Sequence, residues 1–262
     1  MNKNKRVVVG MSGGVDSSVT ALLLKQQGYD VVGLFMRNWE YGIKGSQCPN
    51  RIEFEDAKKV GALIGIEVIG KDFVKEYRDR VFDVFLDGLK QGLTPNPDIL
   101  CNKEIKFNVF LNEAKKMGAD MIATGHYAKI AKYKDHFVLD TPKDNTKDQT
   151  YFLHALSSEQ LSHAMFPLGD LTKKEVREIA RAHNLPVSDK KDSTGICFIG
   201  NQKFDEFITQ HLQAIPGDII DENGKVLGKH KGLICYTLGQ RQGIGLGGIK
   251  ETEAANRTHK PW

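Results

Sequence analysis

The order of apolar and polar positions predicts alternating strands and helices over roughly the first 200 residues. The β-branched run Val-Val-Val at residues 7–9 indicates a strand buried on both faces of a parallel sheet. Val15, Val19 and Leu22 follow at helical spacing and indicate a helix, which Gly28 is suited to end. Further strands are expected at 30–36, 67–69 and 120–124, and helices at 51–64, 74–89, 103–117 and 171–183. This alternation predicts an α/β fold with a parallel sheet.

A different pattern begins near residue 200. The stretch at 217–248 predicts short strands and turns, and Asn223-Gly224 strongly indicates a hairpin. Another hairpin is expected at 128–140, around Lys134-Asp135. We place a domain boundary at residues 200–203, which predicts a parallel-sheet domain over 1–200 and a small β-rich domain over 201–262.

Composition adds only wide bounds. The chain has 262 residues, of which 40% are hydrophobic and 27% are charged, as in an ordinary globular protein. A net charge of +4 permits nucleic-acid binding without indicating it. No apolar run approaches membrane length or resembles a signal peptide, so we expect a cytoplasmic location and no membrane partner. The four cysteines show no C-x-x-C spacing, which argues against a zinc ribbon and predicts no metal site built from them.

The turn between the first strand and the first helix has the composition of a phosphate cradle. Glycines expose backbone N–H groups, and a helix start adds a favourable potential for anions. A Walker-type loop would end in Gly-Lys-Ser/Thr, whereas this one continues as Asp16-Ser17-Ser18 without a lysine. Asp16 would repel phosphate unless Mg²⁺ or a polar partner intervenes. An ordinary turn with solvated serines is the alternative, but a place at the carboxyl end of a strand favours a ligand.

Two of the cysteines stand in motifs that bear on chemistry. In "LTPNPDILCNKEIKF" (93–107) the prolines predict a shaped loop that presents Asn96, Asp98 and Cys101 just before a helix. A helix N-terminus with lysines close by lowers the pKa of a thiol, although an isolated cysteine is more often a buried structural residue. Cys197, in "DSTGICFIG" (192–200), would by itself indicate a core cysteine.

The motifs together resemble a known family. Ser12-Gly-Gly-Val-Asp-Ser17 is similar to the SGGxDS signature of the PP-loop ATP pyrophosphatases. With "NPDILCN", "ATGHYA" (123–128), "KDQTYFL" (147–153) and "STGICFIG", the chain resembles the tRNA-specific 2-thiouridylases over essentially its whole length. The resemblance implies an adenine-nucleotide-binding α/β fold. It also implies that ATP adenylates the C2 oxygen of the tRNA wobble uridine, that sulfur replaces this oxygen, and that an upstream sulfur carrier or cysteine desulfurase supplies the sulfur.

The resemblance also implies the roles of individual residues. Cys197 carries the persulfide, Cys101 is the partner thiol that ends in a disulfide with it, and Asp98 is an acid/base or base-positioning group. ATP, with Mg²⁺, is held by Gly10, Met11, Ser12, Gly13, Gly14, Val15, Asp16, Ser17, Met36 and Gly125. The tRNA is contacted by Asn96, Pro97, Asp98, His126, Lys147, Asp148 and Gln149.

Several of these assignments have plain alternatives. His126 equally fits a structural histidine at a strand end, and residues 147–149 fit a solvated loop. The paired lysines at 58–59, 115–116, 173–174 and 190–191 are expected on solvated faces. Cys48 and Cys235 match no catalytic motif, and Cys235 is expected to pack in a strand.

The C-terminus departs from the family. Relatives continue into a further β-barrel that helps to hold tRNA, whereas this chain stops at Trp262, so we expect a loose tail and weaker tRNA capture. Two other functions remain open. One is a PP-loop ligase or amidotransferase that acts on a small acid, which would give no role to Cys101 and Cys197. The other is a catalytically silent tRNA-binding protein, which would not need either cysteine.

Overall fold

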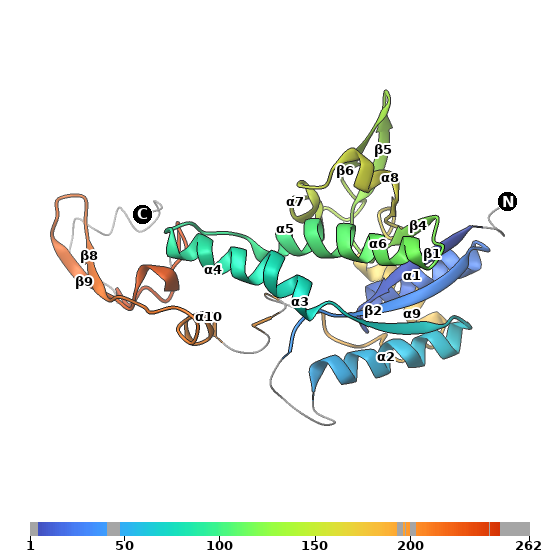
Figure 1. Ribbon diagram of the computed structural model, residues 1–262, viewed down its shortest axis with the longest axis horizontal. Helices are drawn as coiled ribbons and strands as arrows, with labels where there is room; N and C mark the ends of the chain where they lie inside the picture. Colours follow the sequence, from blue (N-terminus) through green and yellow to red (C-terminus); the bar gives the residue numbers. More distant parts are fainter. Residues whose placement is uncertain are drawn as a thin grey trace. The chain divides into compact units, whose positions relative to one another are not determined.

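The computed structural model describes residues 5–40, 48–192, 196, 198–199, 203–240 and 242–246 (Figure 1). The chain divides into two compact units. The first, called the sheet unit, comprises Met1–Phe82 and Pro97–Phe198, and the second, called the hairpin unit, comprises Asp83–Asn96 and Ile199–Trp262. The domain boundary at 200–203 stays a prediction, and the hairpin unit also takes in the short segment Asp83–Asn96.

The sheet unit is built on five parallel strands in the order β3-β2-β1-β4-β7. The strands are β1 (Arg6–Met11), β2 (Asp30–Arg37), β3 (Val68–Asp72), β4 (Met121–Ala123) and β7 (Ala164–Met165). The central strand β1 pairs on both sides, with Val9 opposite Gly33 of β2 and opposite Ala123 of β4. The parallel α/β fold is therefore confirmed, with β7 as an additional short edge strand.

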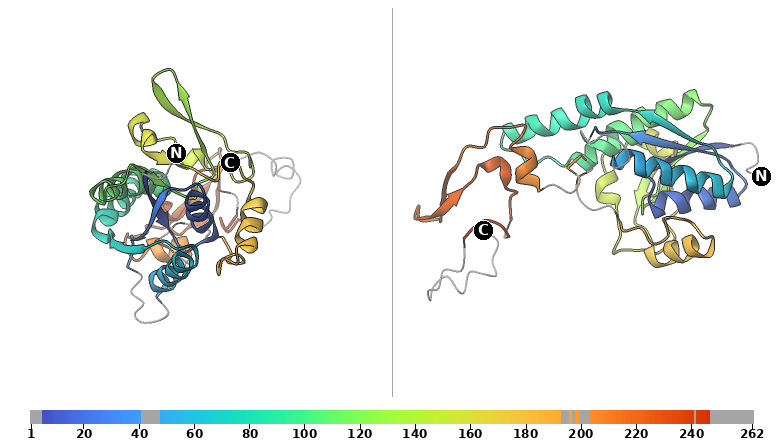
Figure 2. Two further views of the ribbon diagram at one scale, coloured as in Figure 1. Left: turned by 90° about the vertical axis from the view of Figure 1, so that its right-hand side faces the viewer. Right: turned by 90° about the horizontal axis from the view of Figure 1, so that it is seen from below.

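Helices cover both faces of this sheet (Figure 2, left). One face carries α1 (Val15–Gln26), α2 (Pro49–Ile64) and α9 (Lys173–Ala182), which pack on Val7, Val9 and Met11. Thr172 and Glu175 form a capping box at the start of α9. Every second residue of β1 thus enters one apolar core, as a buried strand requires.

The other face is covered by one helical run with a π-helical centre. It consists of α5 (Pro97–Leu100), a π-helical stretch (Cys101–Val109) and α6 (Phe110–Lys116). The expectation that Asp98 and Cys101 lie in a loop before a helix is wrong, because the helix begins six residues earlier than the predicted start at 103. Proline is well tolerated at the first helical position, where its missing N–H would have no partner in any case. Both side chains therefore lie in the first turns of a helix.

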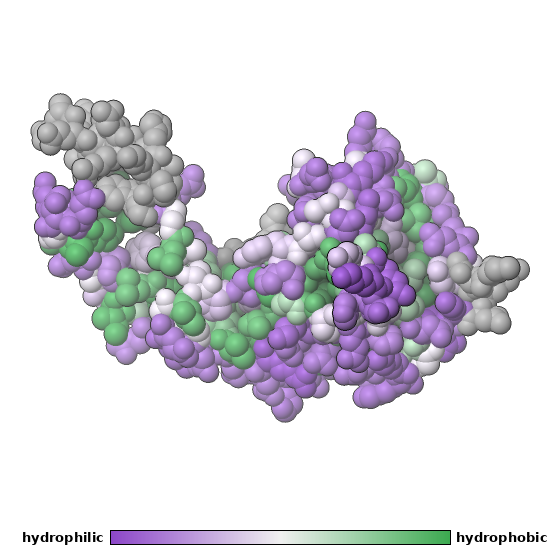
Figure 3. Space-filling model, turned by 90° about the horizontal axis from the view of Figure 1, so that it is seen from above, coloured by the Kyte–Doolittle hydropathy of each residue, from purple (hydrophilic) through white to green (hydrophobic). Residues whose placement is uncertain are grey.

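The remaining elements of the sheet unit lie beside the sheet. β5 (Lys129–Tyr133) and β6 (His136–Asp140) form the expected hairpin, with Lys134 at a φ of 52° in its turn. Its tip is hydrophilic, as the purple projection towards the viewer in Figure 3 shows. The short helices α7 (Thr150–Leu153) and α8 (Ser158–Ser162) follow it, and α3 (Val74–Tyr77) leads into a π-helical turn at Arg78–Phe82.

The hairpin unit contains α4 (Asp83–Lys90), α10 (Phe204–Ile208) and the strands β8 (Gly217–Ile220) and β9 (Val226–His230). The antiparallel β8–β9 pairing and the φ of 80° at Gly224 confirm the predicted Asn-Gly hairpin. Cys235 lies in a 3₁₀ turn (Leu233–Cys235) and not in a strand, which corrects the expectation. Gly232, at a φ of 138°, ends the extended chain just before this turn. Among the described helices of both units, none has the length and apolar character needed to cross a membrane.

Candidate active site

The glycine-rich loop lies between β1 and α1, at the carboxyl end of the central strand, where the sequence predicts it. Gly13 has a φ of 72°, and a Cβ atom there would lie 2.3 Å from the carbonyl oxygen of Glu53 in α2. Only glycine fits this position. The Ser17 hydroxyl lies 3.1 Å from the backbone nitrogen and from the hydroxyl of Ser12, and it donates to the Gly14 carbonyl at 3.2 Å. The serines thus hold the shape of the loop from within.

Asp16 has a strong cationic partner that the sequence does not reveal. The ammonium group of Lys173, the first residue of α9, lies 2.8 Å from each carboxylate oxygen of Asp16. Tyr127 donates its hydroxyl to the same carboxylate at 2.9 Å. The side chain of Lys173 is 13% exposed, whereas that of Lys174 is 86% exposed. The expectation of a solvated lysine pair is therefore wrong for Lys173 and right for Lys174.

Asp192 forms ion pairs with three positively charged side chains, one of which also contacts Asp16. Lys173 and Arg177 each lie 2.8 Å from its Oδ1 atom, and Lys147 lies 3.1 Å from its Oδ2 atom. Burial would raise the pKa of Asp192, but the hydrogen bonds from Lys173 and Lys147 outweigh it and lower the pKa to about 2. Lys147, assigned to tRNA contact by resemblance, is thus linked to Asp16 of the loop through Asp192 and Lys173.

A second lysine reaches the loop from the same part of the chain. Lys190 donates to the Gly13 carbonyl at 3.0 Å and pairs with Asp56 of α2 at 2.9 Å. Burial raises the pKa of the nearby Glu53 carboxyl, and the positive charge of Lys190 opposes this shift only in part. Lys190 was also expected on a solvated face, and its position corrects that expectation. Because Lys190 lies 177 residues from Gly13, no local pattern could have indicated this contact.

Two of the residues assigned to ATP, Met36 and Gly125, flank the loop. A Cβ atom on Gly10 would lie 3.3 Å from the Cε atom of Met36. A Cβ atom on Gly125 would lie 2.8 Å from the backbone nitrogen of Ser17. Met36 and Gly125 come from β2 and from the end of β4, on either side of β1. The structure therefore brings the residues assigned to ATP together in one place.

The thiol motif lies on the helical run over the other face of the sheet. Cys101 is 2% exposed and begins the π-helical stretch. Its neighbour Asn102 donates to the Phe152 carbonyl at 3.1 Å. Burial raises the pKa of Asp98, and the charge of Lys106 opposes this only in part. Cys197 lies outside the described residues, so the approach of the two thiols stays a prediction.

The motifs at 123–128 and 147–153 pack against each other. Gln149 accepts a hydrogen bond from the Tyr127 backbone N–H at 3.0 Å and donates its own backbone N–H to the Tyr127 carbonyl at 3.0 Å. Asp148 accepts hydrogen bonds from the backbone and hydroxyl of Thr150 at 2.8 Å each. Residues 147–149 are thus held by hydrogen bonds, but Lys147 and Asp148 are exposed, so both the tRNA contact and the solvated-loop alternative stay predictions.

His126 is buried in this structure. Its Nδ1 atom lies 2.7 Å from the Thr124 hydroxyl, and its ring centre lies 6.0 Å from those of Phe107 and Phe166. Burial, followed by the charge of Lys106, lowers the pKa of His126 well below its ordinary value. The neutral, enclosed ring favours the structural alternative for this side chain, and tRNA contact stays a prediction.

Comparison with known sequences decides the family. The model of the tRNA methyl transferase HUP domain matches residues 5–201, and that of the tRNA methyl transferase PRC-barrel domain matches residues 205–262. A tRNA-specific 2-thiouridylase MnmA 2 of Aliarcobacter butzleri is 94% identical over all 262 residues, which cover 71% of that protein. The chain belongs to the tRNA-specific 2-thiouridylase family. A second 2-thiouridylase, MnmA of Methylobacillus flagellatus, is 54% identical over 98% of this chain and 70% of its own.

Solved structures resemble this 2-thiouridylase family member more distantly. An NMN synthetase of Francisella tularensis has a TM-score of 0.46 and 18% identity, covering 78% of this chain and 72% of its own. A U34-tRNA thiolase, NcsA, of Methanococcus maripaludis has a TM-score of 0.45 and 19% identity, covering 75% of this chain and 63% of its own.

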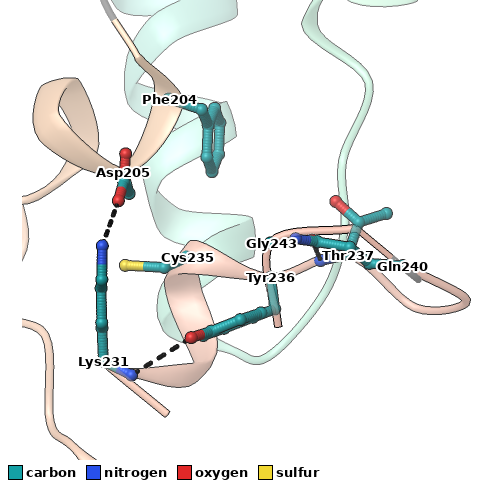
Figure 4. Close-up of a pocket in the computed structure, with 8 residues that line it drawn as sticks. All are labelled: Phe204, Asp205, Lys231, Cys235, Tyr236, Thr237, Gln240 and Gly243. Atoms are coloured by element: carbon teal, nitrogen blue, oxygen red, sulfur yellow. Dashed lines mark hydrogen bonds and ion pairs between the residues drawn. The ribbon is translucent and has the colours of Figure 1, made fainter. Parts of the chain in front are cut away.

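The hairpin unit has a pocket of about 320 Å³ that is lined by residues of this unit (Figure 4). Lys231 directs its ammonium group at Asp205, 2.9 Å away, and its backbone N–H donates to the Tyr236 hydroxyl at 3.4 Å. Cys235 also lines the pocket. Burial and the charge of Asp205 raise the pKa of its thiol, and Lys231 opposes them, so this cysteine stays protonated near neutral pH.

Proposed function

We propose that this chain uses ATP to replace the C2 oxygen of the wobble uridine of tRNA by sulfur, giving 2-thiouridine, AMP and pyrophosphate. Membership of the 2-thiouridylase family supports the reaction class. The observation that carries the proposal is a set of hydrogen bonds between motifs far apart in the sequence, which ties the phosphate loop to the helix of Cys101.

These hydrogen bonds run through the middle of the sheet unit. Asp16 in the loop accepts from Tyr127, and the backbone of Tyr127 pairs with Gln149. Phe152, one helical turn further on, donates to the Gln149 carbonyl at 3.0 Å and accepts from Asn102. A loop that activates the uridine and a thiol that completes the sulfur transfer must act at one site in succession, and a rigid connection of this kind suits that order.

The loop fits a triphosphate. Its glycines and the start of α1 provide N–H groups and a positive potential, and the absence of a lysine within the loop agrees with cleavage at the α-phosphorus. Mg²⁺ belongs to this proposal as the partner of the phosphates. No group of three or more His, Cys, Asp or Glu side chains suited to a metal occurs among the described residues. Mg²⁺ commonly binds through one or two carboxylates together with phosphate oxygens, and Asp16 is proposed to supply one of them.

The chemistry divides into activation and sulfur transfer. The C2 oxygen of uridine attacks the α-phosphorus, and pyrophosphate leaves. The terminal sulfur of the Cys197 persulfide then attacks C2, and AMP leaves with the oxygen. The Cys101 thiolate attacks the Cys197 sulfur, which releases 2-thiouridine and leaves a Cys101–Cys197 disulfide that cellular thiols reduce. The persulfide sulfur comes from an upstream sulfur carrier or desulfurase.

Asp98 suits a proton-transfer role at this site. Its raised pKa brings the carboxyl closer to the working pH, where an acid/base group is most effective. Asn96 and Pro97 precede it and are proposed to shape the contact with an extruded uridine. Lys147, Asp148 and Gln149 are proposed as further tRNA contacts from the turn that also touches Tyr127. A tRNA contact by the buried His126 would need its side chain to become exposed.

A pyrophosphate-release assay separates the candidate functions. Unthiolated tRNA should stimulate release of pyrophosphate from ATP, and addition of a sulfur source should give 2-thiouridine in the digested tRNA by mass spectrometry. A ligase acting on a small acid would release pyrophosphate with that acid and without tRNA. A silent tRNA-binding protein would bind tRNA and release none. Failure of tRNA to stimulate release in a folded protein would contradict the proposed function.

A further inference from the structure

Lys173 brings a positive charge to the loop from a helix 157 residues further along the chain. Its ammonium group contacts both oxygens of Asp16 and one oxygen of Asp192, each at 2.8 Å. Three contacts match the three donors of an ammonium group. The group also lies 5.8 Å from the centre of the Tyr127 ring. Among the described residues, the polar partners of Lys173 are therefore all carboxylates.

Two other cations near the loop, Arg177 and Lys190, are bound to the backbone, whereas the ammonium group of Lys147 contacts only Asp192 among the described residues. Arg177 donates to the carbonyls of Ser188 and Lys190 at 2.8 Å and 3.1 Å. Lys190 donates to the carbonyl of Gly13. Carbonyl oxygens of a folded segment cannot leave without disturbing the chain, so these two cations are fixed. Lys173 has no such contact and can exchange one anionic partner for another.

The carboxylates that hold Lys173 remain satisfied when it turns away. Asp192 keeps its contacts with Lys147 and Arg177. Asp16 keeps the hydroxyl of Tyr127 and faces the loop where a metal ion with phosphates would add positive charge. A change of partner by Lys173 therefore leaves neither carboxylate without a positive or donor group.

The place of Lys173 in its helix is unfavourable without an anion. It is the first residue of α9, and Thr172 with Glu175 fixes the start of that helix. The N-terminal end of a helix carries a positive partial charge that disfavours a lysine and favours an anion. The N-terminal end of α1 lies at the same point, because Asp16 belongs to its first turn. The start of α9 is already capped by the carboxylates of Asp144 and Glu175, so the open positive helix end at the loop is that of α1, and the mostly enclosed ammonium group of Lys173 joins it there.

We propose that Lys173 binds the departing pyrophosphate part of ATP at this loop, in place of the lysine that a Walker-type loop carries in its own sequence. In the empty loop Asp16 and Asp192 hold the ammonium group, and the β- and γ-phosphates of bound ATP take over from Asp16. This inference depends on the proposed use of ATP, and it names the residue that recognises the part of ATP that leaves.

Binding measurements test it without turnover. The affinities for ATP, AMP and inorganic pyrophosphate, with Mg²⁺, are measured by calorimetry for the wild type and for Lys173→Met, which keeps the aliphatic stem. ATP and pyrophosphate should bind about ten- to a hundredfold more weakly, the usual loss for one charged hydrogen bond, while AMP changes little. Lys173→Arg should retain most of the affinity. Lys174→Met, the exposed neighbour, should bind all three ligands like the wild type.

A double variant separates direct contact from an effect through Asp16. In the Asp16→Asn background the loop carboxylate has no charge to neutralise. If Lys173 touches the phosphates, Lys173→Met should still weaken pyrophosphate binding about tenfold in that background. An unchanged affinity there would mean that Lys173 acts only by neutralising Asp16, and the proposal would be wrong. Lys173→Gln, which keeps hydrogen-bonding capacity without charge, replaces the methionine variant if that variant does not fold.

The outcomes also distinguish this proposal from the function on which it depends. A folded wild type that binds neither ATP nor pyrophosphate contradicts the proposed function. A wild type that binds ATP, together with a Lys173→Met variant that binds it equally well, contradicts only the role of Lys173.

Discussion

The hydroxyl of Tyr127 donates a hydrogen bond to the carboxylate of Asp16, 111 residues earlier in the chain, at 2.9 Å. Tyr127 is 2% exposed, and burial together with the charge of Asp16 raises its pKa above the ordinary value for tyrosine. The phenol therefore stays protonated and remains a donor throughout the working pH range. This bond joins the loop to the turn at Gln149, which pairs with the Tyr127 backbone.

Replacing this donor should slow pyrophosphate release strongly but lower the stability of the fold only a little. Tyr127→Phe removes one hydrogen bond to a carboxylate that Lys173 still contacts, so we expect a loss of about 1–2 kcal/mol in the free energy of unfolding. The rate of pyrophosphate release should fall by more than this small loss of stability explains, because Asp16 loses one of the groups that orient it. Tyr133→Phe is the control, since its side chain is 61% exposed. Wild-type release by Tyr127→Phe would remove this bond from the mechanism.

Asp16 and Ser12 should be needed for pyrophosphate release and not for folding. Asp16→Ala removes the carboxylate that contacts Lys173 and is proposed to meet Mg²⁺, and Ser12→Ala removes one hydroxyl of the loop. Both variants should melt cooperatively but release almost no pyrophosphate. Asp170→Ala, an exposed carboxylate, should release it normally. A folded Asp16→Ala variant with wild-type turnover would contradict the assignment of the loop to ATP.

The fold was largely predictable because its elements are long and periodic. The strands β1 and β2 and the helix α9 follow directly from apolar spacing and a capping box. The edge strand β7 has two residues, too few to show any period. The helix start at Pro97 was missed because proline indicates both loops and first helical positions, and only packing of the following helix on the sheet decides between them.

The site was predictable only where its residues stand in compact motifs. The loop at Gly10–Ser17 is contiguous, and its place follows from the strand before it. Lys173 and Lys190 each stand in a lysine pair on a polar stretch, and nothing local distinguishes the member that contacts the loop from the one that faces solvent. Their function depends on contacts across 157 and 177 residues, which tertiary packing alone creates.

Asp98 should give the stability of the protein a specific pH dependence. Its pKa is raised by burial, so the folded chain binds this proton more tightly than the unfolded chain. The resulting stabilisation is fully present below the unfolded pKa, about 3.9, and is lost as the pH rises through the raised folded value. Asp98→Asn has no carboxyl group to titrate at this position, so its stability does not fall with pH for this reason. Its melting temperature relative to wild type should therefore increase from about pH 4 to pH 8, while thiolation is lost.

Asp87→Asn provides the comparison for this titration, because its carboxylate lies on the exposed surface of α4. Its melting temperature relative to wild type should not follow the same pH course. A difference between Asp98→Asn and wild type that stays flat from about pH 4 to pH 8 would contradict the burial of a titrating carboxylate at this position.

Lys147 should contribute to tRNA affinity as a phosphate contact. Binding of unthiolated tRNA should weaken as salt is added, because contacts to phosphate release counterions. Lys147→Ala should weaken binding at low salt and reduce the slope of log affinity against log salt by about one. Lys174→Ala, an exposed lysine on α9, should leave the slope unchanged. If Lys147→Ala keeps the wild-type slope, the lysine serves only its ion pair with Asp192.

The cysteine pair distinguishes sulfur transfer from every other activity of a phosphate loop of this kind. Cys197→Ser should bind ATP and tRNA but accept no sulfane sulfur and make no 2-thiouridine. Cys101→Ser should accept sulfur on Cys197 and then stall, because no thiol remains to resolve the intermediate. Serine keeps nearly the shape of cysteine, so the buried position of Cys101 should tolerate it. Nucleoside analysis and intact-protein mass measure these outcomes.

After one turnover without reductant, the wild type should contain a Cys101–Cys197 disulfide that peptide mass detects. Both single variants must lack it, since each has lost one sulfur of the bond. Cys48→Ser and Cys235→Ser are the matched controls and should thiolate nearly normally. The thiol of Cys235 is a weak nucleophile because its pKa is raised, and Cys48 lies at the start of α2, outside the thiol motifs. Full thiolation by Cys101→Ser or by Cys197→Ser would exclude that residue, since a hydroxyl cannot form the sulfur–sulfur bond on which each step depends.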